Sequence, residues 1–307
     1  MAEHLGVVSV VIPTYNRGER VQGAVENVLT QTHPQVELIV VDDASTDNTV
    51  SRLQTYNTEI TLISNEENKG VSYSRNRGIK HANGEYVAFL DDDDRWRPDK
   101  LERQVQIMDD LPADYCGVYT GSQTVRNGKV IGRTDQPISG DIYPEILVRF
   151  FVFPFTSFLL RRDAIENIGM FDTTMNRGED WDLTIRLARE YNFEAIDEPL
   201  VDRTIHEENV SGDPRHGVES RRDIWEKHGE DIRRYPQVKR RFDYLLRRRE
   251  GSYELSRGNR LRAGKKFIKN LQKQPSVTNL GLLLFSLIGP TGLRVARRVK
   301  SRYDRSR

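Results

Sequence analysis

Residues 7–41 read VVSVVIPTYNRGERVQGAVENVLTQTHPQVELIVV, and this stretch decides the fold. Two short runs rich in valine and isoleucine, at 7–12 and 37–41, flank a segment at 18–31. The apolar residues of that segment recur at helical spacing. A strand, a helix and a second strand in this order are typical of a βαβ unit, in which the two strands are parallel.

The same alternation continues outward from this stretch to residue 94. The pattern predicts a helix over 48–56, a strand over 60–64, a helix over 72–81 and a strand over 85–90. Beyond residue 94 the regularity loosens, and we expect helices over 99–111 and 180–191, a strand over 115–120, and a loop over 203–215. Three further helices are expected over 218–228, 238–255 and 259–272. The sequence therefore predicts an α/β fold with a mostly parallel sheet, followed by a helical extension.

Polar side chains follow each of the first four expected strands. In an open parallel sheet, ligands bind at the carboxyl ends of the strands, so these side chains are candidate binding residues. An acidic cluster at that edge can hold a hard divalent ion that bridges to phosphates. The residues in question are Pro13, Thr14, Tyr15, Asn16 and Arg17, then Asp42 and Asp43, then Asn68, Lys69 and Gly70, and finally Asp91, Asp92, Asp93 and Asp94.

The four consecutive aspartates are the most specific of these signals. A run of acids is usually a solvated turn, but this one closes a strand, YVAFL at 86–90, whose composition indicates burial. Four like charges at such a place reduce stability unless a cation offsets the repulsion. We therefore expect Mn²⁺ or Mg²⁺ there. Asp42 and Asp43 have a second interpretation, because either can cap the helix that follows.

Five polar or glycine-containing segments occur in order along the chain: VSVVIPTYNR at 8–17, VVDDASTDNT at 40–49, NKGVSYSRNRG at 68–78, FLDDDDRWRPDKLE at 89–102 and GEDWDL at 178–183. The Walker lysine motif and the glycine-rich dinucleotide fingerprint are both absent, which argues against the two commonest nucleotide-binding folds. The five segments resemble the motifs of the family 2 glycosyltransferases, which have the GT-A fold with a Rossmann-like sheet.

The resemblance implies an inverting transfer of a sugar from a nucleoside diphosphate donor to an acceptor hydroxyl. Carried over by position, it implies a nucleotide-sugar site and a metal site that share the aspartate run. In the nucleotide-sugar site, Pro13 and Tyr15 flank the base, Asp43 accepts a hydrogen bond from it, and Gly70 and Arg75 lie near the nucleotide and its phosphates. In the run, Asp93 binds the ion, Asp92 faces the ribose or the ion, and Asp91 belongs to the same motif, with an ambiguity of one residue in the register.

A second acidic pair, Glu179 and Asp180, begins an expected helix and offers the base that deprotonates the acceptor. By position in the motif Asp180 is the preferred base, and Glu179 either shares that role or caps the helix. Trp181 forms either an acceptor wall or part of the core. His206 resembles the late histidine of the family that approaches the metal or diphosphate, and a structural role remains its alternative.

Charge divides the chain more sharply than its net value of +1 suggests. From residue 238 onward there are 20 Lys and Arg against 4 acids, whereas the rest carries 27 basic and 42 acidic residues. The apolar run at 280–288 is too short to span a bilayer and is followed by Gly289 and Pro290. With the cations after it, this run indicates either an interfacial anchor on anionic lipid or a terminal helix that packs on the acidic part.

We therefore expect three parts: a GT-A catalytic domain over 1–215, a helical extension over 216–275, and a basic amphipathic membrane-association segment over 276–307. The single cysteine, Cys116, and the absence of a signal-peptide pattern predict a cytoplasmic protein held on the inner face of the cell membrane. The expected acceptor is a lipid-linked or cell-surface glycan, with a soluble acceptor as the alternative. A nucleic-acid partner is not expected, because the basic end lacks an RNA-binding signature.

Overall fold

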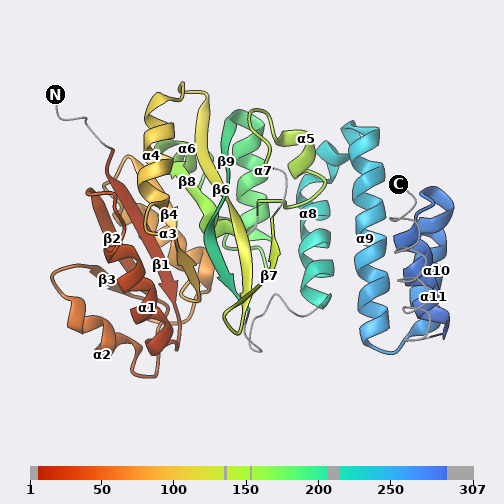
Figure 1. Cartoon of the computed structure of the whole chain (residues 1–307), viewed down its shortest axis with the longest axis horizontal. Coiled ribbons are helices and arrows are strands. Elements are labelled where there is room, and N and C mark those ends of the chain that lie inside the picture. The colour runs from red at the N-terminus through yellow and green to blue at the C-terminus, as the bar shows by residue number, and fades with distance from the viewer. Residues whose placement is uncertain (1–5, 135–136, 153, 206–213, 289–307) are drawn as a thin grey trace. The chain divides into compact units, whose positions relative to one another are not determined.

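The computed structural model describes residues 6–134, 137–152, 154–205 and 214–288, which divide into two compact units. The first unit comprises Met1–Met175 and Glu179–His206, and the second comprises Asn176–Gly178 and Glu207–Arg307. Figure 1 shows a sheet with flanking helices in the first unit and a group of helices in the second.

Within the described residues, one nine-stranded sheet forms the centre of the first unit. Its order is β3-β2-β1-β4-β8-β6-β9-β5, and β7 pairs with β6 outside this path. The strands are β1 (Val8–Thr14), β2 (Val36–Asp42), β3 (Thr61–Ser64), β4 (Tyr86–Phe89), β5 (Asp94–Trp96), β6 (Tyr115–Arg126), β7 (Lys129–Arg133), β8 (Phe158–Arg161) and β9 (Asn192–Thr204).

The half of the sheet that contains β1 is parallel, as the sequence predicts. β1 pairs in parallel with β2 and β4, and β2 with β3. Every residue of β1 is buried, because helices cover the sheet and the strand is a continuous apolar run. The amphipathic helix α1 (Gly18–Leu29) buries Val21, Ala24, Val25 and Val28, which lie three or four residues apart. α2 (Thr49–Leu53) and α3 (Val71–His81) follow β2 and β3.

In the other half of the sheet the sequence pattern predicts only the beginning of β6, over 115–120, and not β5, β7, β8 or β9. β8 is antiparallel to β4 and β6, β5 is antiparallel to β9, and β6 runs parallel to β9. β9 alternates only weakly between buried and exposed residues, so it has no clear strand signature. Its last residues, Arg203 and Thr204, fall in the segment predicted to be a loop. The helices of this region are α4 (Lys100–Asp110), α5 (Tyr143–Ile146), α6 (Arg162–Asn167) and α7 (Glu179–Glu190).

Two glycines set the path of α3 beneath the binding edge. Gly70 precedes the helix with φ +87°, a left-handed conformation that other residues adopt only with strain. Gly78 lies where α3 packs against β1: a Cβ there would stand 2.3 Å from Val11 Cγ1. The helix can therefore approach the sheet closely only because position 78 has no side chain.

The second unit is helical in its described part. Its helices are α8 (Pro214–Arg234), α9 (Pro236–Ser256), α10 (Arg260–Lys273) and α11 (Val277–Ile288). Successive helices pack against one another, and α9, α10 and α11 lie side by side (Figure 1). Among the helices that the structure describes, none is long and apolar enough to cross a bilayer.

Candidate active site

The four post-strand segments meet at one edge of the sheet, because the strands before them are parallel neighbours. Backbone hydrogen bonds extend this alignment past the strand ends. The amide of Asp43 donates to the carbonyl of Thr14 (2.9 Å), and the amide of Asn65 donates to the carbonyl of Asp42 (2.8 Å). The aspartate run forms the turn between β4 and β5, closed by a bond from the Asp94 amide to the Asp91 carbonyl (3.0 Å).

Asp92 and Asp94 are the two buried members of the aspartate run, and Asp92 is held by side chains from β1 and the residues after it. Thr14 Oγ1 donates to its Oδ2 (2.9 Å) and Arg17 Nη1 to its Oδ1 (2.6 Å), and the residue is only 3% exposed. Burial raises the pKa of Asp92 above its ordinary value, although Arg17 and Thr14 stabilise the ionised form. Both carboxylate oxygens thus hold the turn against the end of β1. The contact of Asp92 with a ribose or an ion stays a prediction.

Asp43 performs a similar task for the segment that leads into α3. Its Oδ1 accepts from Asn65 Nδ2 (2.6 Å) and the Lys69 amide (2.9 Å), and its Oδ2 accepts from the Gly70 amide (2.8 Å). Asp43 is buried, so it orders the 65–70 segment directly. The sequence further predicts that this carboxylate accepts a hydrogen bond from a nucleotide base, and that role stays a prediction. Asp42 is also buried, and its Oδ1 has no hydrogen-bond partner among the described residues.

Arg75 connects the two acidic groups that the sequence separates. Its Nη2 donates to Asp91 Oδ1 (2.8 Å) and its Nη1 to Asp180 Oδ1 (2.5 Å). The guanidinium is buried, with its Cζ 5.5 Å from the ring centroid of Phe155 and 5.3 Å from that of Phe171. The two rings and two carboxylates hold the arginine in one orientation. Asp91 keeps 36% of its side chain exposed and Asp180 keeps 21%, so both face the accessible side of this group.

Burial and the neighbouring charges shift the pKa values of Arg75 and Asp180. Burial alone lowers the pKa of Arg75, but Asp180 and Asp91 together hold it above its ordinary value. Burial raises the pKa of Asp180 to about 7, because the carboxylates of Glu179 and Asp91 add to the loss of hydration and outweigh the attraction of Arg75. A carboxylate with a pKa near neutrality is suited to accept a proton from a hydroxyl group.

The aspartate run also fits a divalent cation. Burial raises the pKa of Asp94 well above its ordinary value, and Asp91 and Asp93 raise it further. A bound cation reverses this repulsion. Within residues 6–134, 137–152, 154–205 and 214–288, no three His, Cys, Asp or Glu side chains already stand as a set of ligands. Magnesium in phosphate-handling sites is commonly held by one or two carboxylates with substrate phosphates, and Asp91 and Asp93 supply that number.

Sequence reasoning missed Arg203 as a member of this cluster. The register of β5 against β9 places it opposite Asp94, whose negative form it stabilises. Burial lowers the pKa of Arg203, and the aspartates of the run oppose that change. Only the long-range pairing of β9 brings this arginine to the site. The residues that follow it are rich in loop-forming types, so the local sequence predicts a loop at this position and not a strand.

The remaining predicted residues are found in different environments. Pro13 is buried in β1, whereas Tyr15 is 43% exposed at its end. Trp181 is 5% exposed and its Nε1 donates to the carbonyl of Ile146, so it belongs to the core. Glu179 is the first residue of α7, directly before Asp180. His206 lies outside the described residues.

Together these groups can perform one kind of chemistry. A cation on Asp91 and Asp93 would neutralise a departing diphosphate, and Asp180 can accept a proton from an attacking hydroxyl. Arg75 couples the two ends of this arrangement through its two ion pairs.

Known proteins share both the fold and parts of the sequence. A protein of Escherichia coli, the UDP-Glc:alpha-D-GlcNAc-diphosphoundecaprenol beta-1,3-glucosyltransferase WfgD, is 36% identical over 132 residues, which cover 43% of this chain and 51% of the relative. The match thus spans about half the length of that relative.

Solved structures extend the similarity to most of the chain. The S. aureus TarS fragment 1-349 in complex with UDP-GlcNAc has a TM-score of 0.63 at 21% identity, covering 92% of this chain and 81% of that one. The mannosyltransferase PcManGT from Pyrobaculum calidifontis, in complex with GDP-Man and Mn²⁺, has a TM-score of 0.56 at 19% identity, covering 98% and 88%. These likenesses show that the fold is GT-A, as expected from the sequence.

The family model for glycosyl transferase family 2 matches residues 9–169, which is more than half of the chain and extends from β1 through the aspartate run to α6. With its fold and its post-strand residues in agreement, the chain belongs to glycosyl transferase family 2.

Proposed function

We propose that this family 2 glycosyltransferase transfers a sugar, with inversion, from a nucleoside diphosphate sugar to a hydroxyl of a lipid-linked or cell-surface glycan. The observation that carries the proposal is the Arg75 bridge, which joins the predicted metal ligand Asp91 to the predicted base Asp180. Leaving group and acceptor must meet at the anomeric carbon, so the groups that serve them must lie close together.

In this proposal the diphosphate binds at the aspartate run with Mn²⁺ or Mg²⁺ on Asp93 and Asp91. Asp92 and Asp43 hold the surrounding turns, Pro13 and Tyr15 flank the base, and Gly70 lies near the nucleotide. One relative is named for transfer from UDP-Glc, and two structural neighbours were solved in complex with UDP-GlcNAc and with GDP-Man, which supports a nucleotide-sugar donor here without naming the sugar.

The acceptor part of the proposal rests on the second unit and on one relative. The WfgD relative is described by its name as acting on a diphosphoundecaprenol-linked sugar. In this chain α11 buries Asn279, Gly281 and Ser286 but leaves Leu287 56% and Ile288 52% exposed. The buried residues of this helix are thus small or polar, whereas three of its four exposed residues are apolar, an arrangement suited to a membrane interface. All basic residues of the predicted anchor come after 288 and lie outside the described residues.

A soluble glycan acceptor is the second candidate, since nothing in the catalytic unit requires a lipid. The two candidates share the donor site and differ in whether the second unit must contact a membrane.

A thermal-shift screen tests the donor site without knowledge of the acceptor. Melting of the protein is followed with UDP-Glc, UDP-GlcNAc and GDP-Man, each with Mn²⁺, with Mg²⁺ or with excess chelator. A donor at about 100 times its Kd stabilises the folded state by about 2.7 kcal/mol. We expect one donor to raise the melting temperature only when the metal is present.

Asp93→Ala should abolish this metal-dependent shift, whereas Asp110→Ala, which removes an exposed acid from α4, should preserve it. Full turnover in excess chelator would exclude the metal role, and equal shifts in both variants would exclude Asp93 as a ligand.

A further inference from the structure

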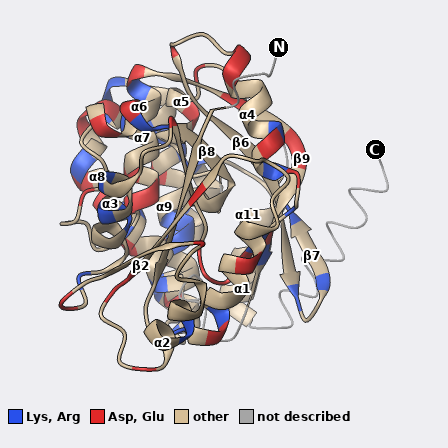
Figure 2. Ribbon diagram, turned by 90° about the vertical axis from the view of Figure 1, so that its left-hand side faces the viewer, with Lys and Arg blue, Asp and Glu red and all other residues tan. Residues whose placement is uncertain are grey.

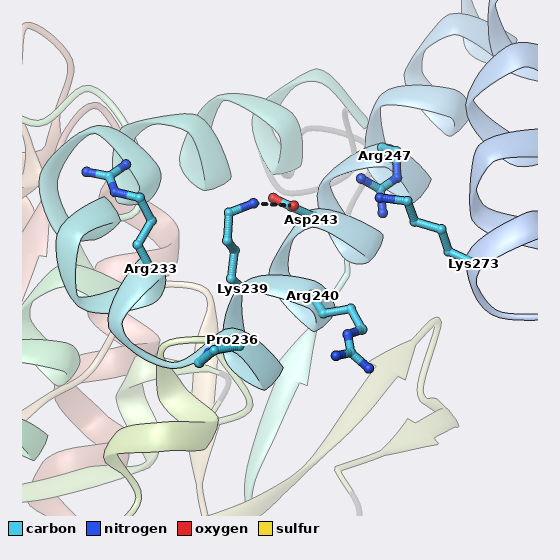
Figure 3. Close-up of a pocket in the computed structure, with 7 residues that line it drawn as sticks. All are labelled: Arg233, Pro236, Lys239, Arg240, Asp243, Arg247 and Lys273. Atoms are coloured by element: carbon cyan, nitrogen blue, oxygen red, sulfur yellow. Dashed lines mark hydrogen bonds and ion pairs between the residues drawn. The ribbon is translucent and has the colours of Figure 1, made fainter.

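The second unit contains a pocket of about 320 Å³ where α8, α9 and α10 meet. Figure 3 shows the side chains that line it. Five of the seven are cationic and one is acidic: Arg233, Pro236, Lys239, Arg240, Asp243, Arg247 and Lys273.

One face of α9 supplies most of this lining. Its contributing residues lie three or four positions apart, from Pro236 at the first turn to Arg247, and so project from the same side of the helix. The last turn of α8 adds Arg233, and the last residue of α10 adds Lys273. Three helices thus bring cations to a single space, although none of them carries the whole cluster.

Most of this positive charge is not neutralised within the unit. Asp243 Oδ2 accepts from Lys239 Nζ at 2.8 Å, and Arg247 Nε donates to the neutral Asn270 Oδ1 at 2.8 Å. In the part of the chain that the structure describes, Arg240 and Lys273 have no ion pair or hydrogen bond. The single carboxylate is already used by Lys239, so the rest of the pocket carries a surplus of positive charge.

Helix dipoles explain only part of this arrangement. Arg233 and Lys273 lie at the C-terminal ends of their helices, where a cation is favourable. Lys239 and Arg240 lie near the N-terminal end of α9, where the dipole disfavours a cation. Asp243 offsets the charge of Lys239, whereas the exposed Arg240 has no carboxylate partner among the described residues, so an anion bound between these cations would relieve their mutual repulsion.

The shape and chemistry of the pocket restrict the anion. Guanidinium groups match the oxygens of phosphate in paired hydrogen bonds, and lysine adds a point charge. No aromatic ring is among the lining residues, and the nearby Trp225 ring is already in contact with Arg233 Cζ (5.2 Å from the ring centroid) and Lys239 Nζ (5.6 Å), so the pocket itself presents no ring for a nucleotide base. The volume is at the lower limit for ligand pockets, which suits one phosphoryl group with a small substituent.

We propose that this pocket binds a phosphate-bearing ligand, a phosphomonoester or phosphodiester, at a site separate from the donor site. The phosphoryl group belongs either to a lipid headgroup or to a soluble phosphate compound. The proposal is independent of the transfer reaction and can be tested without donor or acceptor.

Calorimetric titration of the full chain with inorganic phosphate, at constant ionic strength, tests the site. The pocket variant is Arg240→Gln/Lys273→Gln. The matched control is Arg262→Gln/Lys265→Gln, which removes the same two charges from exposed positions of α10 outside the pocket. We expect phosphate to bind at least about tenfold more weakly to the pocket variant, since each lost charge-assisted hydrogen bond accounts for roughly that factor. The control should bind like the wild type.

Vesicles then distinguish the source of the phosphate. If phosphatidylglycerol vesicles bind the wild type and the control but not the pocket variant, the ligand is a lipid headgroup. If the three proteins bind vesicles equally while phosphate binding still depends on the pocket, the ligand is a soluble phosphate compound. Equal phosphate affinity in all three proteins, or equal losses in both variants, overturns the proposal, because net charge alone would then account for binding.

Discussion

Asp180 is held between two opposing influences, the positive charge of Arg75 and the loss of hydration on burial. The ion pair fixes where the carboxylate points, and burial keeps its basicity high enough to accept a proton. We expect Asp180→Asn to lower turnover by at least about a hundredfold, which is the lower end of the contribution of a positioned base. Donor binding should survive, because Asp91 and Asp93 remain.

Steady-state kinetics with the acceptor, combined with donor titration, check this prediction. Glu179→Gln is the neighbouring control and should retain most of its activity. If Asp180→Asn stays active and Glu179→Gln is inactive, Glu179 is the base and Asp180 is not. If both variants stay active, the base is another residue.

Lys100, the first residue of α4, is another charged side chain that the fold buries. Its side chain is fully buried; its Nζ donates to Gln104 Oε1 at 2.7 Å and lies 4.0 Å from the centroid of the Trp96 ring. No carboxylate pairs with it among the described residues. Burial lowers the pKa of Lys100 well below its ordinary value.

This shift predicts how stability changes with pH. Between the lowered pKa of folded Lys100 and the ordinary value of 10.5, the unfolded chain binds more protons than the folded one. The free energy of unfolding should therefore increase as pH rises above the lowered pKa of folded Lys100, up to about pH 8.5, by up to about 1.4 kcal/mol per pH unit from this residue. Denaturant unfolding at three pH values measures the slope.

Lys100→Met should reduce that slope, and Lys80→Met, at an exposed position of α3, should leave it unchanged. The comparison uses slopes because the Met variant also leaves Gln104 Oε1 without its donor. Equal slopes in the wild type and Lys100→Met would contradict the prediction. The range stops below pH 9, because burial raises the pKa of the Cys116 thiol above its ordinary value of 9.0 and an opposite trend begins there; near pH 10 it is followed by Tyr86, whose pKa is raised by burial and by Asp109.

Among the helices, α3 is the one whose position most directly determines the site, because it carries Arg75. Gly78→Ala should force it away from β1, since the added Cβ would stand 2.3 Å from Val11 Cγ1. Overpacking of this kind costs about 1–3 kcal/mol. We expect that loss in denaturant unfolding, together with weaker donor binding.

The double variant Gly78→Ala/Val11→Ala provides the control, since it removes the methyl groups that the new Cβ would meet. Its loss of stability should be smaller than the sum of the two single losses. Additive losses would show that the contact at Gly78 does not limit the approach of α3.

The two units differ in charge as well as in fold. Along helices such as α6 and α7 of the first unit, acidic and basic residues occur together (Figure 2). The chain from residue 238 onward has 20 basic against 4 acidic residues. Attraction of this part to anionic vesicles should therefore weaken as salt increases.

The exposed face of α11 should add a contribution that salt does not screen. Leu280→Glu/Leu287→Glu should weaken binding to anionic vesicles by at least about tenfold, because inserting each leucine contributes roughly 1.5 kcal/mol or more. Co-sedimentation at low and high salt measures this effect. Val130→Glu/Ile131→Glu, at exposed positions of β7 in the first unit, adds the same charge and is the control. Equal weakening in both variants would mean that added charge alone explains the loss.

Local sequence pattern was sufficient for the parallel half of the sheet and for the residues at its edge. Strand β1, helix α1 and strand β2 depend on neighbouring residues whose apolar spacing is visible along the chain. Parallel order then places the residues after each strand at one edge, so the aspartate run and Asp43 could be predicted to lie there. Helices α8, α9 and α10 of the second unit were predicted for the same reason, although their ends differ by up to six residues; the run that forms α11 was not assigned as a helix.

Contacts between residues far apart in the sequence determine the other half of the sheet and the side-chain pairs of the site. Arg75 meets Asp180 across 105 positions and Thr14 meets Asp92 across 78, and no local pattern encodes which side chains will pair over such separations. The weakly alternating β9 becomes a strand only because β6 and β5 offer it hydrogen-bond partners, and this brings Arg203 to the aspartates. Likewise, the inward face of α11 depends on Tyr244, whose hydroxyl donates to Asn279, since spacing alone shows that a helix has faces but not which face its neighbours bury.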